Sequence, residues 1–84
     1  MSAQPELQPR ELFMRHAKRD GRSVARLRAV DYGGPCVVEA EVYPSRGGTM
    51  TAGPYTFADA HHATAFVTEA VESLMYLGCD IFAE

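Results

Sequence analysis

The sequence predicts a single α+β domain: a three-stranded antiparallel meander with a long C-terminal helix packed on one face and a short N-terminal helix. Apolar residues recur at three- and four-residue steps over residues 59–77, a spacing typical of an amphipathic helix. Apolar and polar residues alternate over residues 23–43, a pattern typical of half-buried strands. The predicted order is α-β-β-β-α, and 84 residues suffice for one domain only.

The chain begins with a predicted flexible arm over residues 1–8, so the domain spans residues 9–84. Pro9 suits the first turn of a helix, because backbone amides there make no hydrogen bond within the helix and proline has no amide hydrogen. We expect a short helix from Arg10 to Lys18 that ends before Gly21. Its docking face consists of Leu12, Phe13, His16 and Ala17.

A β-hairpin is predicted next, with Gly33-Gly34 as a two-residue turn that needs positive φ. This turn sets a register that pairs Leu27 with Ala40 and Ala29 with Val38 on one side, and Arg26 with Glu41 and Arg28 with Glu39 on the other. Each cross-strand pair of opposite charges stabilises a sheet by up to about 1 kcal/mol. The turn, the apolar pairs and the charged pairs all indicate the same hairpin register.

The third strand is predicted over residues 49–57, with Tyr55 and Phe57 sharing a face. Pro54 lacks an amide donor, so we expect this strand at the edge of the sheet or interrupted by a bulge.

The long helix is predicted over residues 59–77. Asp59 suits the N-cap position and Gly78 the left-handed residue that ends a helix, with Leu74 and Cys79 in apolar contact. Its apolar stripe consists of Ala63, Phe66, Val67, Ala70, Val71, Leu74 and Leu77. After it, residues 79–82 form a short apolar tail that we expect to lie back on the core.

Composition indicates a soluble globular protein, with 46% hydrophobic and 23% charged residues. No apolar run approaches the ~20 residues that span a bilayer. No early positive charge followed by an apolar stretch marks a secretory signal, so we expect a cytoplasmic protein. Two cysteines, Cys36 and Cys79, favour buried free thiols, with a single bridge between them as the alternative.

Charge is distributed unevenly along the chain. Residues 1–30 hold seven of the eight Lys and Arg, whereas residues 31–84 hold eight acidic residues against one arginine. Clustered basic residues on one helix can contact phosphates, which makes nucleic-acid binding the alternative function. The residues of this cluster are Arg10, Arg15, Lys18, Arg19 and Arg22.

The predicted element order also resembles that of the double-stranded RNA-binding domain, in outline only. That resemblance implies an RNA contact through a lysine-rich start of the second helix, where this chain has His61 and His62. It also implies a histidine-bearing loop between the first two strands, where this chain has the Gly33-Gly34 turn.

No motif indicates a metal or a reaction. His61 and His62 are adjacent and point about 100° apart on a helix, which prevents both from gripping one ion. No serine or cysteine lies in a motif that implies a base beside it. No glycine-rich loop opens a helix to hold a phosphate. We therefore expect neither an enzyme nor a cofactor.

The third kind of site is a protein-binding surface on the sheet. The face of the hairpin that carries the Arg/Glu pairs also carries apolar residues, namely Val24, Val30, Val37 and Tyr43. The third strand adds an edge that a partner strand can extend, in another protein or in a second copy of the chain. The sequence therefore favours a small non-catalytic binding or adaptor module, a monomer or homodimer, that contacts another protein through its sheet face or edge strand.

Overall fold

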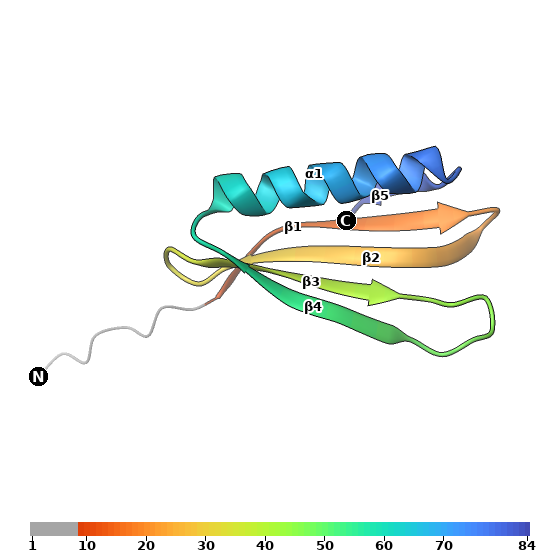
Figure 1. Cartoon of the computed structure of the whole chain (residues 1–84), viewed down its shortest axis with the longest axis horizontal. Helices are drawn as coiled ribbons and strands as arrows, with labels where there is room; N and C mark the ends of the chain where they lie inside the picture. Colours follow the sequence, from red (N-terminus) through yellow and green to blue (C-terminus); the bar gives the residue numbers. More distant parts are fainter. Residues whose placement is uncertain (1–8) are drawn as a thin grey trace, which may run out of the picture.

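The structure, a computed structural model, describes residues 9–84, and the predicted arm of residues 1–8 lies outside the described residues. The described chain forms five strands and one helix (Figure 1). Their bounds are β1 Arg10–Arg19, β2 Arg22–Asp31, β3 Cys36–Val42, β4 Met50–Phe57, α1 Ala60–Tyr76 and β5 Asp80–Ala83. The strands form one antiparallel sheet in the order β4-β3-β2-β1-β5.

The predicted hairpin is confirmed as β2 and β3, in the predicted register. Leu27 pairs with Ala40 and Arg28 pairs with Glu39. The Asp31 carboxylate supports the turn, because its Oδ1 accepts hydrogen bonds from the amides of Gly33 and Gly34 at 2.8 and 3.3 Å.

The predicted N-terminal helix is wrong, because residues 10–19 form strand β1, which pairs along its length with β2. Two irregularities in the pairing, at Glu11/Phe13 and Ala17/Lys18, break the two-residue period and hide the strand from pattern analysis. The apolar doublet at Leu12 and Phe13, which suggested a helix face, lies at the first irregularity. Pairing with β1 satisfies the backbone groups that β2 would otherwise present at an edge.

The sheet has five strands rather than three, and the element order is β-β-β-β-α-β rather than α-β-β-β-α. Besides β1, the second addition is β5, formed by the chain segment that we expected only to lie back on the core. It pairs with the second half of β1, from Arg15 opposite Ala83 to Lys18 opposite Asp80. Four residues are too few for a recognisable alternation, so this strand depends on its partner.

Helix α1 has the predicted caps. The Asp59 side chain accepts a hydrogen bond from the His62 amide at 2.9 Å. At the other end, the amides of Gly78 and Cys79 donate to the carbonyls of Met75 and Leu74 at 2.9 and 3.0 Å, the two bonds of a Schellman motif.

The core lies between α1 and one face of β2 and β3. Its buried residues are Leu27, Ala29, Cys36, Val38, Ala40, Ala63 and Val67. Two aromatic residues of β4 join it through Phe66 of α1, whose ring centroid is 5.0 Å from that of Tyr55 and 5.2 Å from that of Phe57. The predicted stripe of α1 is wrong at one position, since Leu77 is 64% exposed.

The two cysteines lie at opposite ends of the domain. Cys36 opens β3 opposite Phe57, just before α1, and Cys79 follows the end of α1. Since α1 has 17 residues, the length of the helix, about 25 Å, separates the positions of the two cysteines. Both thiols are free and buried, which excludes the bridge. Burial raises the pKa of Cys36.

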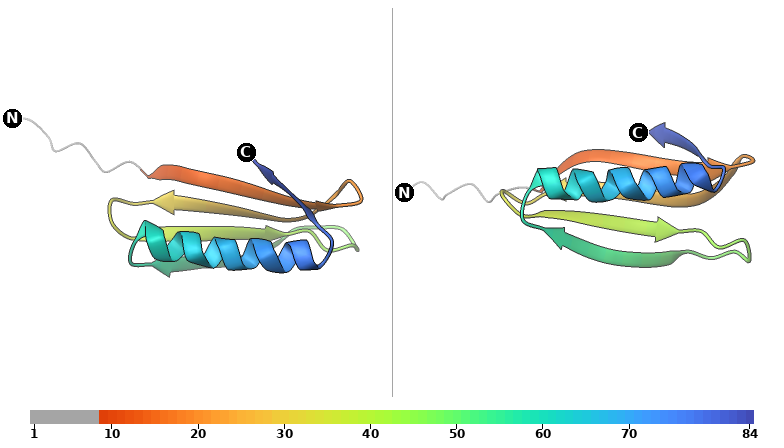
Figure 2. Two further views of the ribbon diagram at one scale, coloured as in Figure 1. Left: turned by 90° about the horizontal axis from the view of Figure 1, so that it is seen from above. Right: turned by 45° about the horizontal axis from the view of Figure 1, so that its top comes forward.

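Helix α1 leaves part of the sheet uncovered. It packs on the centre of the sheet, against β2 and β3, while β4 diverges from it toward its C-terminal end (Figure 1; Figure 2 gives two further views). Three side chains at or beside β4 are consequently exposed although they point to the α1 side: Val42 at 38%, Met50 at 63% and Tyr55 at 40%. We call these three residues the apolar strip.

Gly53 is expected to be essential to the shape of β4. Its φ is +85°, and a Cβ at this position would lie 2.9 Å from Tyr55 Cδ2 and from the Tyr55 amide nitrogen. Gly53→Ala therefore combines an unfavourable φ with a clash. We expect it to lower the free energy of unfolding by more than about 1 kcal/mol. Gly48→Ala is the control, because its φ is +83° with no atom within 4 Å of the added Cβ. Equal losses for both variants in urea titrations would show that the clash has no effect.

Candidate functional site

The four residues predicted to bind a protein share one face of the sheet. The alternation along β2 and β3 places Val24, Val30, Val37 and Tyr43 on the face turned away from α1, which we call the open face. Val30 is only 2% exposed and offers little surface to a partner. The other three are half-buried. Their role in binding stays a prediction.

Charged side chains form a network over the centre of the open face. Arg28 lies between two carboxylates, 3.3 Å from Glu11 and 3.6 Å from Glu39. Arg26 lies opposite Glu41 in the register, but its guanidinium turns toward β1 and β5. It contacts Met14 Sδ at 3.1 Å and Glu84 at 3.5 Å.

Glu41 is consequently left without a cation. Among the described residues, no Lys, Arg or His nitrogen lies within 4.0 Å of its carboxylate, and its partner is the Tyr43 hydroxyl, which donates to Oε2 at 2.7 Å. This hydrogen bond, together with burial, raises the pKa of Tyr43. Glu41 is exposed and lines two hollows of the open face, one shared with Arg26 and Arg28 and one beside β4.

A shallow groove of about 440 Å³ runs along the open face beside β4. Its lining includes Tyr32, Val37, Glu39, Glu41, Thr51 and Pro54. The apolar strip lies on the other face of the same strand. Sequence analysis missed both features, although an eight-residue strand without any charged residue was a signal of an unprotected edge.

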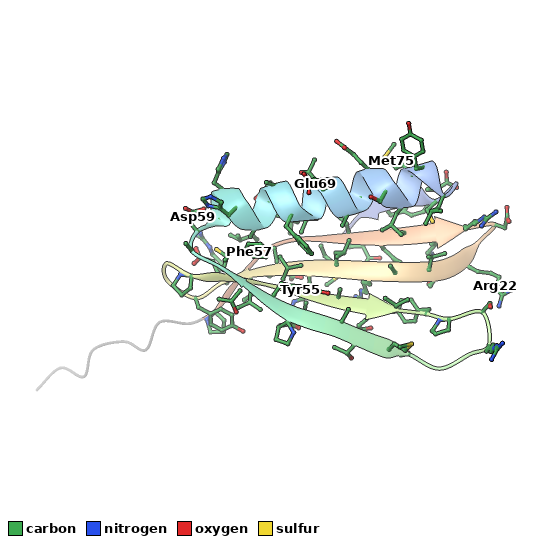
Figure 3. The ribbon with its side chains drawn as sticks, viewed as in Figure 1. Arg22, Tyr55, Phe57, Asp59, Glu69 and Met75 are labelled. Carbon is green, nitrogen blue, oxygen red and sulfur yellow. The ribbon has the colours of Figure 1, made fainter. Side chains whose placement is uncertain are left out.

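Strand β4 satisfies both alternatives predicted from Pro54, an edge strand or a bulge. It ends the sheet beside β3, and its pairing shifts between Tyr55 opposite Val38 and Ala52 opposite Ala40. The bulge contains Gly53 and Pro54. Tyr55 and Phe57 lie on the α1 side, as predicted for residues that share a face (Figure 3).

The structure does not bring the five predicted nucleic-acid-binding residues together, because the helix expected to carry them is a strand. Arg10 and Arg19 lie at opposite ends of β1, which at about 3.3 Å per residue are roughly 30 Å apart. Arg15 points to the α1 side, beside Val67 and Val71. Lys18 lies over the Phe82 ring on the open face, at 5.5 Å.

Two of these basic residues, Arg19 and Arg22, border a second groove of about 540 Å³ between the β1–β2 turn and the β3–β4 loop. Arg46 belongs to that loop. Among residues 9–84, no carboxylate lies within 4.0 Å of Arg19, Arg22 or Arg46. The side chain of Arg22 extends from its turn into solvent (Figure 3).

The paired histidines at the start of α1 serve the helix cap. The His62 ring lies 2.7 Å from Asp59 Oδ1, and the hydrogen bond from the His62 amide lowers the pKa of Asp59. Within the part of the chain that the structure describes, no three His, Cys, Asp or Glu side chains are grouped to hold a metal ion.

Comparisons with known proteins give no relative. No family model matches the chain, and neither a curated protein nor a solved structure is significantly similar to it. No helix within residues 9–84 is long and apolar enough to cross a membrane.

His16 joins β5 to the open face, and this junction predicts a pH dependence. Its ring lies 2.9 Å from Glu84 Oε1 and 2.8 Å from Ser23 Oγ. The bond with His16 lowers the pKa of Glu84 from its ordinary value of 4.5. Folding therefore favours the carboxylate, and this contribution to stability is present above pH 4.5 and is lost as pH falls through the lower, folded-state pKa.

We expect Glu84→Gln to destabilise the protein at neutral pH and to match the wild type once Glu84 is protonated in the folded state. Urea titrations of both proteins between neutral pH and pH ~3 measure this difference. Glu69→Gln, on the exposed side of α1, is the control for the loss of one charge. A wild-type advantage that is constant over this range would contradict the prediction.

Proposed function

We propose that this protein is a non-catalytic binding module that adds an extended segment of a partner protein to the edge of its sheet at β4. The observation that carries the proposal is the combination of an uncharged edge strand with a groove on one face and exposed apolar side chains on the other. The proposal keeps two expectations from the sequence, namely that the protein acts in the cytoplasm and that it needs no cofactor.

An added strand fits both features at once. Its backbone pairs with the free backbone groups of β4, and its side chains alternate between the two faces of the sheet. Side chains on one face meet the groove that includes Glu41 and Thr51. Those on the other face meet the apolar strip, whose exposed area is unusual for a sheet side that carries a helix.

The bulge limits the length of the segment that binds. Pro54 has no amide to donate, so β4 offers two short pairing segments, residues 50–52 and 55–57. Such an interruption also protects an edge strand from indiscriminate pairing. A binding segment must therefore match the bulge, which favours selected partners over any extended chain.

The apolar strip gives the direct test. Peptides selected against the protein from a random display library are the probe. Met50→Lys should weaken their binding roughly fivefold, since it replaces an apolar contact worth about 1 kcal/mol, while leaving the unfolding midpoint unchanged. Met75→Lys on α1 is the matched control, because Met75 is 58% exposed and Met50 is 63% exposed.

Hydrogen exchange of the same complexes locates the binding site. We expect amides of β4 to gain protection on binding, because their outward N–H groups then pair with the added strand. Selected peptides that leave β4 unprotected, or that bind Met50→Lys and wild type equally, would overturn the proposal.

Nucleic-acid binding is the second candidate, at a different place from the one that the sequence predicted. The favouring observation is that Arg19 and Arg22, neither of which has a carboxylate within 4.0 Å among the described residues, line the groove between two hairpin ends together with Asp20. The phosphate backbone of a nucleic-acid strand is the ligand that suits such arginines.

Arg22→Gln should then reduce binding of a labelled single-stranded RNA and lower the slope of log affinity against log salt by about 0.7. Arg10→Gln is the control, because Arg10 lies at the opposite end of β1 and 3.5 Å from Asp31. Fluorescence anisotropy over a range of salt concentrations measures both. Identical slopes for the two variants would exclude this candidate.

A further inference from the structure

The proposed function leaves the chemistry of the partner segment open, and the charges beside β4 define it. Resting on that function, we propose that the segment added to β4 alternates basic and apolar residues, with lysine or arginine on the open face and apolar side chains on the α1 side.

An excess of negative charge on the open face beside β4 is the first reason. The groove is lined by two carboxylates, Glu39 and Glu41, and by no basic residue. Glu39 shares Arg28 with Glu11, so one guanidinium serves two carboxylates. Glu41 has no cation within 4.0 Å among the described residues.

Contacts elsewhere in the fold keep Arg26 from forming an ion pair with Glu41. Arg26 lies directly opposite Glu41 in the β2–β3 register, where an ion pair is the ordinary arrangement. Its guanidinium is bonded instead to Met14 and to Glu84, which follows β5, and it also lies close enough to the Tyr43 hydroxyl to oppose the rise in the pKa of Tyr43. The carboxylate of Glu41 is therefore available to a cation that arrives from the β4 side.

Register places this carboxylate next to the edge. Glu41 is paired with Thr51 of β4, and the next strand outward would place its own residue beside Thr51 on the same face. A lysine or arginine there reaches across the small threonine side chain to Glu41, because its charged group stands at the end of a long flexible stem.

The other face of the added strand has the opposite requirement. Neighbours of a basic residue in the segment point to the α1 side, where they meet Met50 and Tyr55. No charged residue belongs to β4, so β4 itself offers no partner for a charge on this side. Apolar side chains bury the strip and are favoured by about 25 cal/mol per Å² of apolar surface removed from water.

A second copy of the chain, joined edge to edge through β4, does not meet these requirements. Such a pairing brings no basic residue to the groove, since β4 has none. It would instead bring two copies of Glu41 toward one interface, which like-charge repulsion disfavours. The favoured occupant is therefore an extended, alternating basic and apolar segment of another protein.

Three synthetic peptides test the proposal on the intact protein. Each alternates valine with one other residue over the length of β4, and that residue is lysine, glutamine or glutamate. We expect affinity to fall in the order lysine, glutamine, glutamate at low salt, and the difference to shrink as salt rises. Titration calorimetry gives the affinities, and hydrogen exchange reports whether β4 becomes protected.

Glu41→Gln identifies the carboxylate responsible. It should reduce the affinity of the lysine peptide roughly two- to fivefold and leave the glutamine peptide unchanged. Glutamine still accepts the Tyr43 hydrogen bond, so the fold is retained. Glu69→Gln, which removes an equal charge from the exposed side of α1, should change neither affinity.

The outcomes separate the two proposals. Protection of β4 by all three peptides with equal affinity would overturn the charge preference and leave strand addition standing. Binding without protection of β4, or no binding by any peptide, would overturn both. A dimer that forms through β4 in the absence of peptide, detected by sedimentation, would replace the partner segment with a second copy.

Discussion

The single register of β2 and β3 is the constraint on which the rest of the structure depends. It places Leu27, Ala29 and Val38 on the face that α1 covers, and it places every charged residue of the two strands' centres on the other face. A slip by one residue would move arginines into the core and valines into water. β1 and β4 then take their faces from these two strands.

The hairpin was predictable because its information is local. The turn glycines, the alternation and the opposite charges all lie within about 20 residues and agree with one another. The same was true of α1, whose caps at Asp59 and Gly78 bound a regular apolar period. β1 was not predictable in this way, because its two irregularities disturb the period and its identity as a strand comes from β2.

The candidate site depends on information that is not local at all. The predicted register makes Arg26 and Glu41 neighbours, and the structure confirms it. The sequence also predicts an ion pair between them, but the two charged groups are not within 4.0 Å of each other. What separates them is Glu84, which competes for Arg26 from 58 residues away along the chain. The ion pairs could be predicted only if the position of β5, which precedes Glu84, was known. β5 is too short to be recognised from its sequence pattern.

The width of the sheet explains why the β4 edge is left uncovered by the helix. Five strands about 4.8 Å apart span roughly 24 Å, whereas a helix is about 10 Å across. One helix therefore covers about two strands, and α1 packs on β2 and β3. A protein that has no partner for the remaining edge protects it with charge. β4 instead has apolar or uncharged residues on both faces, with Met50 63% exposed. Its sequence suits a strand that is covered when the protein acts.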